Sequence, residues 1–351
     1  STFGEGNRWA NFPSVAVGWS FSEEPFIKRL TGGWLNWGKI RGSYGKSGQT
    51  FTSAYLAHGL MNIMDKSFFG KTGITTDKPV SPYLTWEKTR QYDLGLDMDM
   101  FNYRLNVKLD YYYKYTSSLI YDIPIPGSLY AFGAQVENAM EISNEGLELE
   151  LQADILRESA VSWRMKFNMA RNWNRFEKSY SGKDVVDGDG TLLVGGRPLN
   201  GLYVWAHRGY YNSDAEVPRL YKIDGQEIYF NGVATNGISG AVGDYRLLDL
   251  DGDGNPDSYY AGSPLPLAHG GWVNELMWKN FDLNVLVNFT IGRKMINNRM
   301  GLGFSRQSED GHLTKLFDYR KLRPWDGVNK KPNAPAWGNS LSMNTDSAIE
   351  K

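Results

Sequence analysis

An acidic run in the second half of the chain is the densest set of side chains that could bind a metal ion. It follows the pattern D-x-D-x-D-G-x-x-D and comprises Asp249, Asp251, Asp253, Gly254 and Asp257. In a calcium loop, alternate carboxylates converge on one ion, and a glycine takes the sixth position, where the chain turns sharply. The twelfth position is Tyr260 rather than the bidentate glutamate of an EF-hand. The run therefore fits either a Ca²⁺ site or an Asp/Gly turn held by its own hydrogen bonds.

A second candidate site is a group of aromatic side chains in the longest stretch that lacks strand periodicity. Its members are Tyr203, Trp205, Tyr210 and Tyr211. Aromatic rings combine an apolar face with a polar edge or hydroxyl, so they can stack on sugars. We take them as candidate substrate-binding residues. The alternative is that they form a small core within a loop or contact a lid.

Catalytic chemistry has little support in this sequence. Cysteine is absent, which excludes disulfides and thiol catalysis within the chain. The histidines lack the spacing of a zinc site, and there is no nucleophile elbow, P-loop or dinucleotide fingerprint. Carboxylate pairs such as Asp97/Asp99 and Glu148/Glu150 lie on regular strands, where a polar lining explains them. We predict no enzyme activity, no catalytic residues and no required cofactor, the Ca²⁺ site being the one open case.

Composition narrows the class of protein. The 351 residues carry a formal net charge of −1, which gives no basic excess for binding nucleic acid. Mean hydropathy is −0.47, and no stretch approaches the roughly 18 apolar residues of a membrane helix. Barrel strands alternate apolar and polar residues, so they remain compatible with this low value. Aromatics reach 14% and glycines number 39, as expected for interfacial girdles and tight turns.

Period-two alternation over long runs is the main structural signal, and it predicts about eight strands. The clearest case is a hairpin in which Leu94–Met100 and Leu105–Thr116 flank the turn Phe101–Arg104. Apolar residues occupy one face of each strand, while Asp, Glu, Lys and Arg occupy the other. Similar alternation occurs in Val15–Phe21, Leu35–Gly45, Leu147–Gln152, Val161–Ala170, Asn274–Trp278 and Phe281–Thr290. Several runs match the ~9–11 residues that a tilted strand needs to cross a bilayer.

The connections between these strands alternate in length. Those at 22–34, 101–104, 154–160 and 279–280 are short, and those at 46–86, 117–144, 172–268 and after 291 are long. Bacterial barrels have short periplasmic turns and long extracellular loops, whereas a Greek-key sandwich has no such rule. The fold class is therefore an all-β transmembrane antiparallel barrel. The alternatives are a secreted glycan-binding β-sandwich or adhesin, and a passive porin.

Several motifs along the chain resemble the SusC/RagA type of TonB-dependent outer-membrane transporter. They include Gly38–Gly45 with Ser47-Gly48-Gln49, Trp86-Glu87-Lys88-Thr89, Gly95-Leu96-Asp97, Asn144–Glu148, and the segment from Gly243-Asp244 through the acidic run to Gly270-Gly271. Gln49 stands where the family pattern has Asn. The resemblance extends from the first residues to about Gly292.

The resemblance implies that residues 1–351 are a C-terminal part of a large, 22-stranded barrel in the bacterial outer membrane. The plug, the TonB-binding region, and the first and last strands would then lie outside the chain. It further implies TonB-driven import of an oligosaccharide or peptide, with a SusD-like surface lipoprotein as partner. Outer-membrane lipid would surround the apolar face. A homodimer is left open.

Overall fold

A computed structural model describes residues 6–50, 61–68, 70–76, 79, 81, 83–126, 133–157, 159–186, 192–213, 215–216, 220–221, 227–228, 242–248, 250, 257–296, 323, 325–328, 332 and 349–350. The chain divides into two compact units. One comprises Ser1–Leu199 with Leu265–Gly292, and the other comprises Asn200–Pro264 with Arg293–Lys351. Each unit is described by itself.

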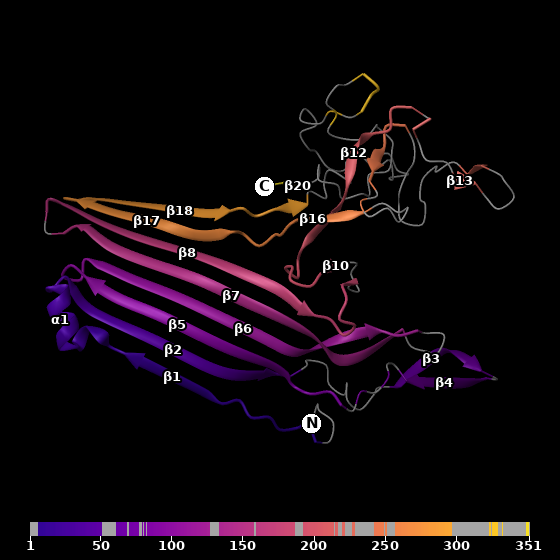
Figure 1. Cartoon of the computed structure of the whole chain (residues 1–351), viewed down its shortest axis with the longest axis horizontal. Coiled ribbons are helices and arrows are strands. Elements are labelled where there is room, and N and C mark those ends of the chain that lie inside the picture. The colour runs from indigo at the N-terminus through magenta and orange to yellow at the C-terminus, as the bar shows by residue number, and fades with distance from the viewer. Residues whose placement is uncertain are drawn as a thin grey trace. The chain divides into compact units, whose positions relative to one another are not determined.

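The first unit is built on one eight-stranded antiparallel sheet (Figure 1). Each strand pairs with the next in a continuous hydrogen-bonded series. In their order across the sheet, the strands are β1 (Ser14–Trp19), β2 (Leu35–Gln49), β5 (Glu87–Met100), β6 (Leu105–Pro124), β7 (Ala134–Leu156), β8 (Val161–Lys178), β17 (Ala268–Trp278) and β18 (Phe281–Ile291).

The remaining elements are short. The first unit also contains the 3₁₀ turn η1 (Phe21–Glu23), the helix α1 (Pro25–Thr31), the hairpin β3 (Met61–Phe68) with β4 (Lys71–Thr76), and the pair β9 (Val185–Val186) with β10 (Leu192–Leu193). The second unit contains four strand pairs: β11 (Leu202–Trp205) with β16 (Ser258–Gly262), β12 (His207–Tyr210) with β15 (Tyr245–Leu247), β13 (Leu220–Tyr221) with β14 (Glu227–Ile228), and β19 (Met295–Ile296) with β20 (Ile349–Glu350).

The predicted hairpin of β5 and β6 is confirmed in its register. Met98 lies opposite Val107, and Leu96 lies opposite Leu109. The turn Phe101–Arg104 closes with a hydrogen bond of 3.0 Å from the Arg104 amide to the Met100 carbonyl. Because the side-chain period of a strand is two, this register puts all the apolar alternates on one face.

Several connections differ from the sequence prediction: β2 continues to Gln49 and β8 to Lys178, inside the predicted loops 46–86 and 172–268. Within 22–34, where no helical period was expected, the chain forms α1, with Pro25 in its first turn and Gly32 in the left-handed conformation at its end (φ 54°). Seven residues are too few to show a helical period, but Pro at the start and Gly just past the end are the usual signals for such a helix.

The predicted long loop 117–144 is wrong in its bounds. β6 continues to Pro124 and β7 begins at Ala134. The register between the two strands shifts between Thr116 and Leu119, and Ser118 has a φ of 61°. A bulge of this kind changes the phase of the alternation. Beyond the bulge, the strict alternation of Leu105–Thr116, from which the strand was predicted, no longer continues.

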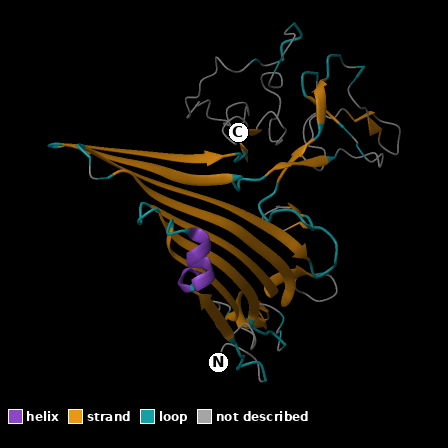
Figure 2. Cartoon of the chain, turned by 60° about the vertical axis from the view of Figure 1, so that its left-hand side comes forward, coloured by secondary structure: helices purple, strands orange, loops and turns teal. Residues whose placement is uncertain are grey.

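Long and short connections nevertheless alternate as predicted. The connections after β2, β6 and β8 are each longer than the two beside them, although the one after β6 (125–133) is shorter than the one after β1 (20–34). By the rule for bacterial barrels, the ends joined by short turns face the periplasm and the opposite ends face outward. Figure 2 shows that the sheet of the first unit is a single curved layer.

The apolar face of this layer is exposed in the chain. Val17, Leu94 and Leu283 are 69%, 57% and 57% exposed, respectively. A soluble sheet would cover such a face with a second layer, but in a barrel the face contacts lipid. None of the helices in the described part of the chain is both long and apolar enough to cross a bilayer.

A compact hydrophobic core occurs at the outward ends of β7 and β8, where the segment that contains β9 and β10 folds against them. It consists of Met140, Phe176, Val185 and Leu193. Backbone hydrogen bonds of 2.8 Å join Phe176 to Arg197 and to Gly196. This core anchors the first part of the connection after β8 to the sheet.

Candidate functional site

Charged side chains follow the polar face of the sheet in cross-strand rows. One cross-strand row places Lys39, Asp97, Lys108 and Glu150 opposite one another on β2, β5, β6 and β7. Opposite charges on directly paired residues stabilise an antiparallel sheet, and like charges would destabilise it. The alternating signs therefore support the register while they keep this face hydrated.

Arg41 is the centre of the next row. Its Nε lies 2.9 Å from Asp97 on β5, and its terminal nitrogen lies 2.6 Å from Asp110 on β6. The guanidinium can reach both because it lies across Gly95, where an added Cβ would meet it at 2.4 Å. A glycine in a strand often marks such a close approach. The motif Gly95-Leu96-Asp97 therefore has a structural role, since its glycine makes room for the arginine that its aspartate binds.

Tyr112 uses a second glycine in the same way. Its ring lies over Gly146 of β7, where an added Cβ would come within 2.4 Å of the ring carbons. Its hydroxyl donates a hydrogen bond of 2.7 Å to the side-chain oxygen of Asn172 on β8. The aromatic ring thus covers the exposed backbone of the glycine, a known way of stabilising glycine positions in sheets.

Further ion pairs extend the polar face toward the periplasmic end. Arg164 lies 2.6 Å from Asp154, and Lys166 lies 2.9 Å from Glu275 on β17. The face thus offers both donors and acceptors to a polar solute. The carboxylate pairs considered above belong to it, and Asp97 is held by Arg41, so its position is explained as part of the wall.

The sequence did not single out Arg41 or Tyr112. Each stands in an alternating strand like any other polar residue, and the side chains that approach it come from other strands. Gly95 and Gly146 were the available signal, because an isolated glycine within a strand pattern indicates a bulge or a close contact.

The four loop aromatics lie in the second unit, on and beside β11 and β12. Tyr203 packs on Tyr260 of β16, with ring centroids 5.7 Å apart. Tyr210 stacks on Tyr245 of β15 at 5.2 Å. Tyr210 and Tyr211 are 9% and 8% exposed.

Two of the four side chains therefore serve a small core within this connection, whereas Tyr203 and Trp205 are half-buried. Contact of any of the four with substrate stays a prediction. Tyr211 has one further property: burial raises the pKa of its hydroxyl above the usual value, while the charge of Arg246 opposes the shift and that of Asp244 adds to it.

The acidic run is described only in part. Asp249, Asp251 and Asp253 lie outside the described residues, so the Ca²⁺ site stays a prediction. Asp257 is described, and its carboxylate accepts a hydrogen bond of 2.5 Å from the Leu250 amide. Its backbone pairs with Leu248 and Ala206 at 2.9 Å. Asp257 therefore closes the loop locally, and this arrangement is compatible with both the turn and the ion site.

A single curved antiparallel layer, apolar on its exposed face and lined with paired charges on the other, defines the wall of an outer-membrane β-barrel. The comparison with known proteins agrees with this class. The family profile described as TonB dependent receptor-like, beta-barrel matches residues 1–285.

Individual relatives point the same way. TonB-dependent receptor P26 of Formosa agariphila is 30% identical over 357 residues, which cover 97% of this chain and 34% of that protein. TonB-dependent receptor SusC of Bacteroides thetaiotaomicron is 26% identical over 331 residues, which cover 90% of this chain and 30% of that protein. The solved structure of the RagAB peptide transporter superposes with a TM-score of 0.74 at 24% identity, covering 100% of this chain and 36% of that one.

The chain belongs to the β-barrel family of TonB-dependent receptors, and its place is the bacterial outer membrane. The resemblance to SusC/RagA proteins is confirmed, and so is the barrel fold. The β-sandwich alternative is wrong, since the described sheet is one layer that continues from β1 to β18. The chain spans about a third of the length of the curated relatives that it matches.

Proposed function

We propose that the whole protein imports a nutrient across the outer membrane by a TonB-dependent mechanism. The observation that carries this proposal is the division of the sheet into a lipid face and a charged face, in a chain that belongs to the receptor family. A wall lined by paired charges, such as Arg41 with Asp97 and Lys166 with Glu275, keeps a path through the barrel polar. Family membership supports energy coupling over passive diffusion.

We further propose that the substrate is an oligosaccharide or a peptide, and that a SusD-like lipoprotein acts with the barrel. Support comes from relatives: one is named SusC, and solved structures with the same fold are titled as the RagAB peptide importer. The mixed charge of the wall suits a polar, flexible substrate, because the wall offers positively charged hydrogen-bond donors and negatively charged acceptors.

Uptake by cells that carry the full-length receptor tests the mechanism. Labelled peptides and oligosaccharides are supplied to cells with the receptor, without it, and with the receptor but without TonB. We expect uptake of one substrate class only when both proteins are present. Uptake that survives the loss of TonB would establish the porin alternative instead.

Cysteine labelling tests which face lines the path, since this chain has no native cysteine. Ser43 lies on the polar face and Leu94 on the apolar one, on adjacent strands. We expect a membrane-impermeant thiol reagent to label Ser43→Cys and to slow uptake, and to leave Leu94→Cys unlabelled in membranes. The reverse pattern would contradict the assignment of the two faces.

Detergent extraction followed by mass spectrometry tests the partner. We expect a surface lipoprotein to purify with the receptor in constant proportion, and the mass of the intact complex to report whether two copies assemble. A receptor that is active in uptake yet purifies alone would remove the lipoprotein from the proposal.

A further inference from the structure

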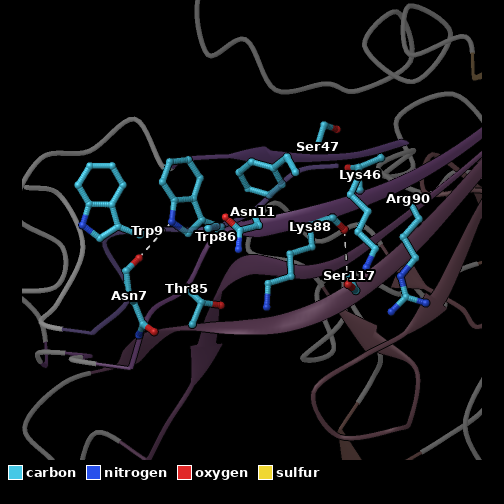
Figure 3. Close-up of a pocket in the computed structure, with 13 residues that line it drawn as sticks. Asn7, Trp9, Asn11, Lys46, Ser47, Thr85, Trp86, Lys88, Arg90 and Ser117 are labelled. Carbon is cyan, nitrogen blue, oxygen red and sulfur yellow. Dashed lines mark hydrogen bonds between the residues drawn. The ribbon is translucent and has the colours of Figure 1, made fainter. Parts of the chain in front are cut away.

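A pocket on the lipid-facing side of the first unit, at its outward end, contains three cationic side chains. Its volume is about 350 Å³, and its lining includes Lys46, Lys88, Arg90, Trp9 and Trp86. Figure 3 shows the two indoles on one side of the pocket and the three cations on the other. The complete lining contains no aspartate or glutamate.

The register brings the cations together. Lys46 of β2 lies directly opposite Arg90 of β5, and Lys88 lies two residues before Arg90, on the same face. Like charges placed opposite each other destabilise a sheet unless something compensates for them. In the described chain, none of the three forms an ion pair, which contrasts with Arg41, Arg164 and Lys166 on the polar face. No carboxylate among the described residues therefore neutralises these three positive charges.

The fourth position of this patch, at Gly48, is covered by an aromatic ring. Lys88 lies opposite Gly48, which has no side chain to fill the space between the strands. The ring of Phe12 lies over Gly48, close enough that an added Cβ would clash with it. Phe12 also packs edge-on against Trp86, with centroids 5.6 Å apart. The cations are thus bordered by an apolar aromatic wall.

The depth of the pocket in the membrane follows from the residues below it. Two residues along each strand toward the periplasm, Tyr44 and Tyr92 lie on the same face with ring centroids 4.8 Å apart, and Tyr113 continues the row at 6.4 Å. Tyrosines on a lipid-facing surface mark the membrane interface. Two residues of strand add about 7 Å, which is the depth of the headgroup layer outside the hydrocarbon core.

We propose that this pocket, the cationic interface pocket, binds the phosphate group of a lipid in the outer leaflet. Ammonium and guanidinium groups bind phosphate through charge-assisted hydrogen bonds, and arginine can do so with two. The indoles and Phe12 accommodate the apolar part of the lipid next to its headgroup. A membrane lipid is favoured over a soluble phosphate because the pocket faces the lipid side and borders the tyrosine row and the apolar band.

Native mass spectrometry of the full-length receptor in detergent tests this proposal. The probes are dioleoyl phosphatidic acid, dioleoyl phosphatidylcholine and inorganic phosphate. The variant Lys46→Gln/Lys88→Gln/Arg90→Gln removes the cations. The control Lys39→Gln/Lys114→Gln/Lys279→Gln removes the same charge from the polar face and the periplasmic turn. Circular dichroism verifies that both variants are folded.

We expect the native protein and the control to retain phosphatidic acid. The variant without the three cations should bind it at least about tenfold more weakly, because the loss of a single charge-assisted hydrogen bond weakens binding by about this factor. Phosphatidylcholine, with its compensating positive charge, should distinguish the variants less. Lys88→Arg/Arg90→Lys preserves the charge and should preserve binding. Equal retention by both triple variants would overturn the proposal. Displacement of the lipid by millimolar inorganic phosphate would show that the pocket binds soluble phosphate, and this result would also overturn the lipid assignment.

Discussion

Replacing Val285 by arginine tests the lipid-facing orientation of the sheet most directly. Val285 lies on β18 (Phe281–Ile291), on the apolar face, and is 41% exposed in the chain. Eleven residues at about 3.4 Å each, tilted by about 45°, span about 26 Å, which matches the apolar band of an outer-membrane barrel. Val285 is the fifth of these residues, so it lies one residue from the midplane.

The expected cost follows from this depth. An arginine at the midplane of a barrel destabilises the folded state by about 2–4 kcal/mol, and the cost falls toward zero at the interfaces. We therefore expect Val285→Arg to fall within that range. Val107→Arg, at the third residue of β6 and closer to a periplasmic turn, should fall at its lower end.

Asn284 offers a matched control on the same strand. It points to the polar face, opposite Glu275 of β17, so an arginine there gains a carboxylate neighbour and stays out of lipid. We expect Asn284→Arg to change stability by less than about 0.5 kcal/mol, as for other surface changes.

The assay is denaturant unfolding of the full-length receptor in phospholipid vesicles, with the free energy extrapolated to water. Equal losses for Val285→Arg and Asn284→Arg would refute the assignment of the two faces. A larger loss for Asn284→Arg would reverse it.

Three further predictions concern the polar face and the loop core. Gly146→Val should destabilise the barrel by about 1–3 kcal/mol through overpacking against Tyr112, and adding Tyr112→Ala should recover most of the loss in the same unfolding assay. Arg41→Met should lower the free energy of unfolding by about 1 kcal/mol, because the Arg41 side chain is 41% exposed and solvent partly screens its ion pairs. In a double-mutant cycle, Asp97→Asn should destabilise the Arg41→Met protein less than it destabilises the native protein. Burial raises the pKa of Tyr211, so its hydroxyl ionises at lower pH in the unfolded chain than in the folded one. Stability should therefore fall as the pH rises above about 10, and Tyr211→Phe should reduce this fall when unfolding is compared at pH 9 and pH 11.

The strands of the barrel could be predicted where alternation is regular. The pairing of Met98 with Val107 follows from a tight turn and an uninterrupted period of two. The strand ends beyond Thr116 could not be predicted in the same way, because the bulge near Ser118 shifts the phase of the alternation.

The candidate sites were predictable only as sets of residue types. Tyr210 and Tyr211 were identified as aromatic neighbours, but their burial depends on Tyr245 and the segment that holds it, which lie more than thirty residues along the chain. Spacing within one segment carries no information on which distant segment will cover it.

The sequence by itself determined the fold class, the two faces and the family, because each depends on local periodicity or on motifs that can be read along the chain. Only the tertiary structure decided which charges meet. It placed Arg41 across Gly95 between Asp97 and Asp110, and it brought Lys46 opposite Arg90 beside Trp9 and Trp86. The physical reason is that the period of two in a strand sets the face on which a side chain lies. The neighbours of that side chain depend on the register with the adjacent strands. A shift of the register by any even number of residues leaves the alternation unchanged, so alternation alone does not determine these neighbours.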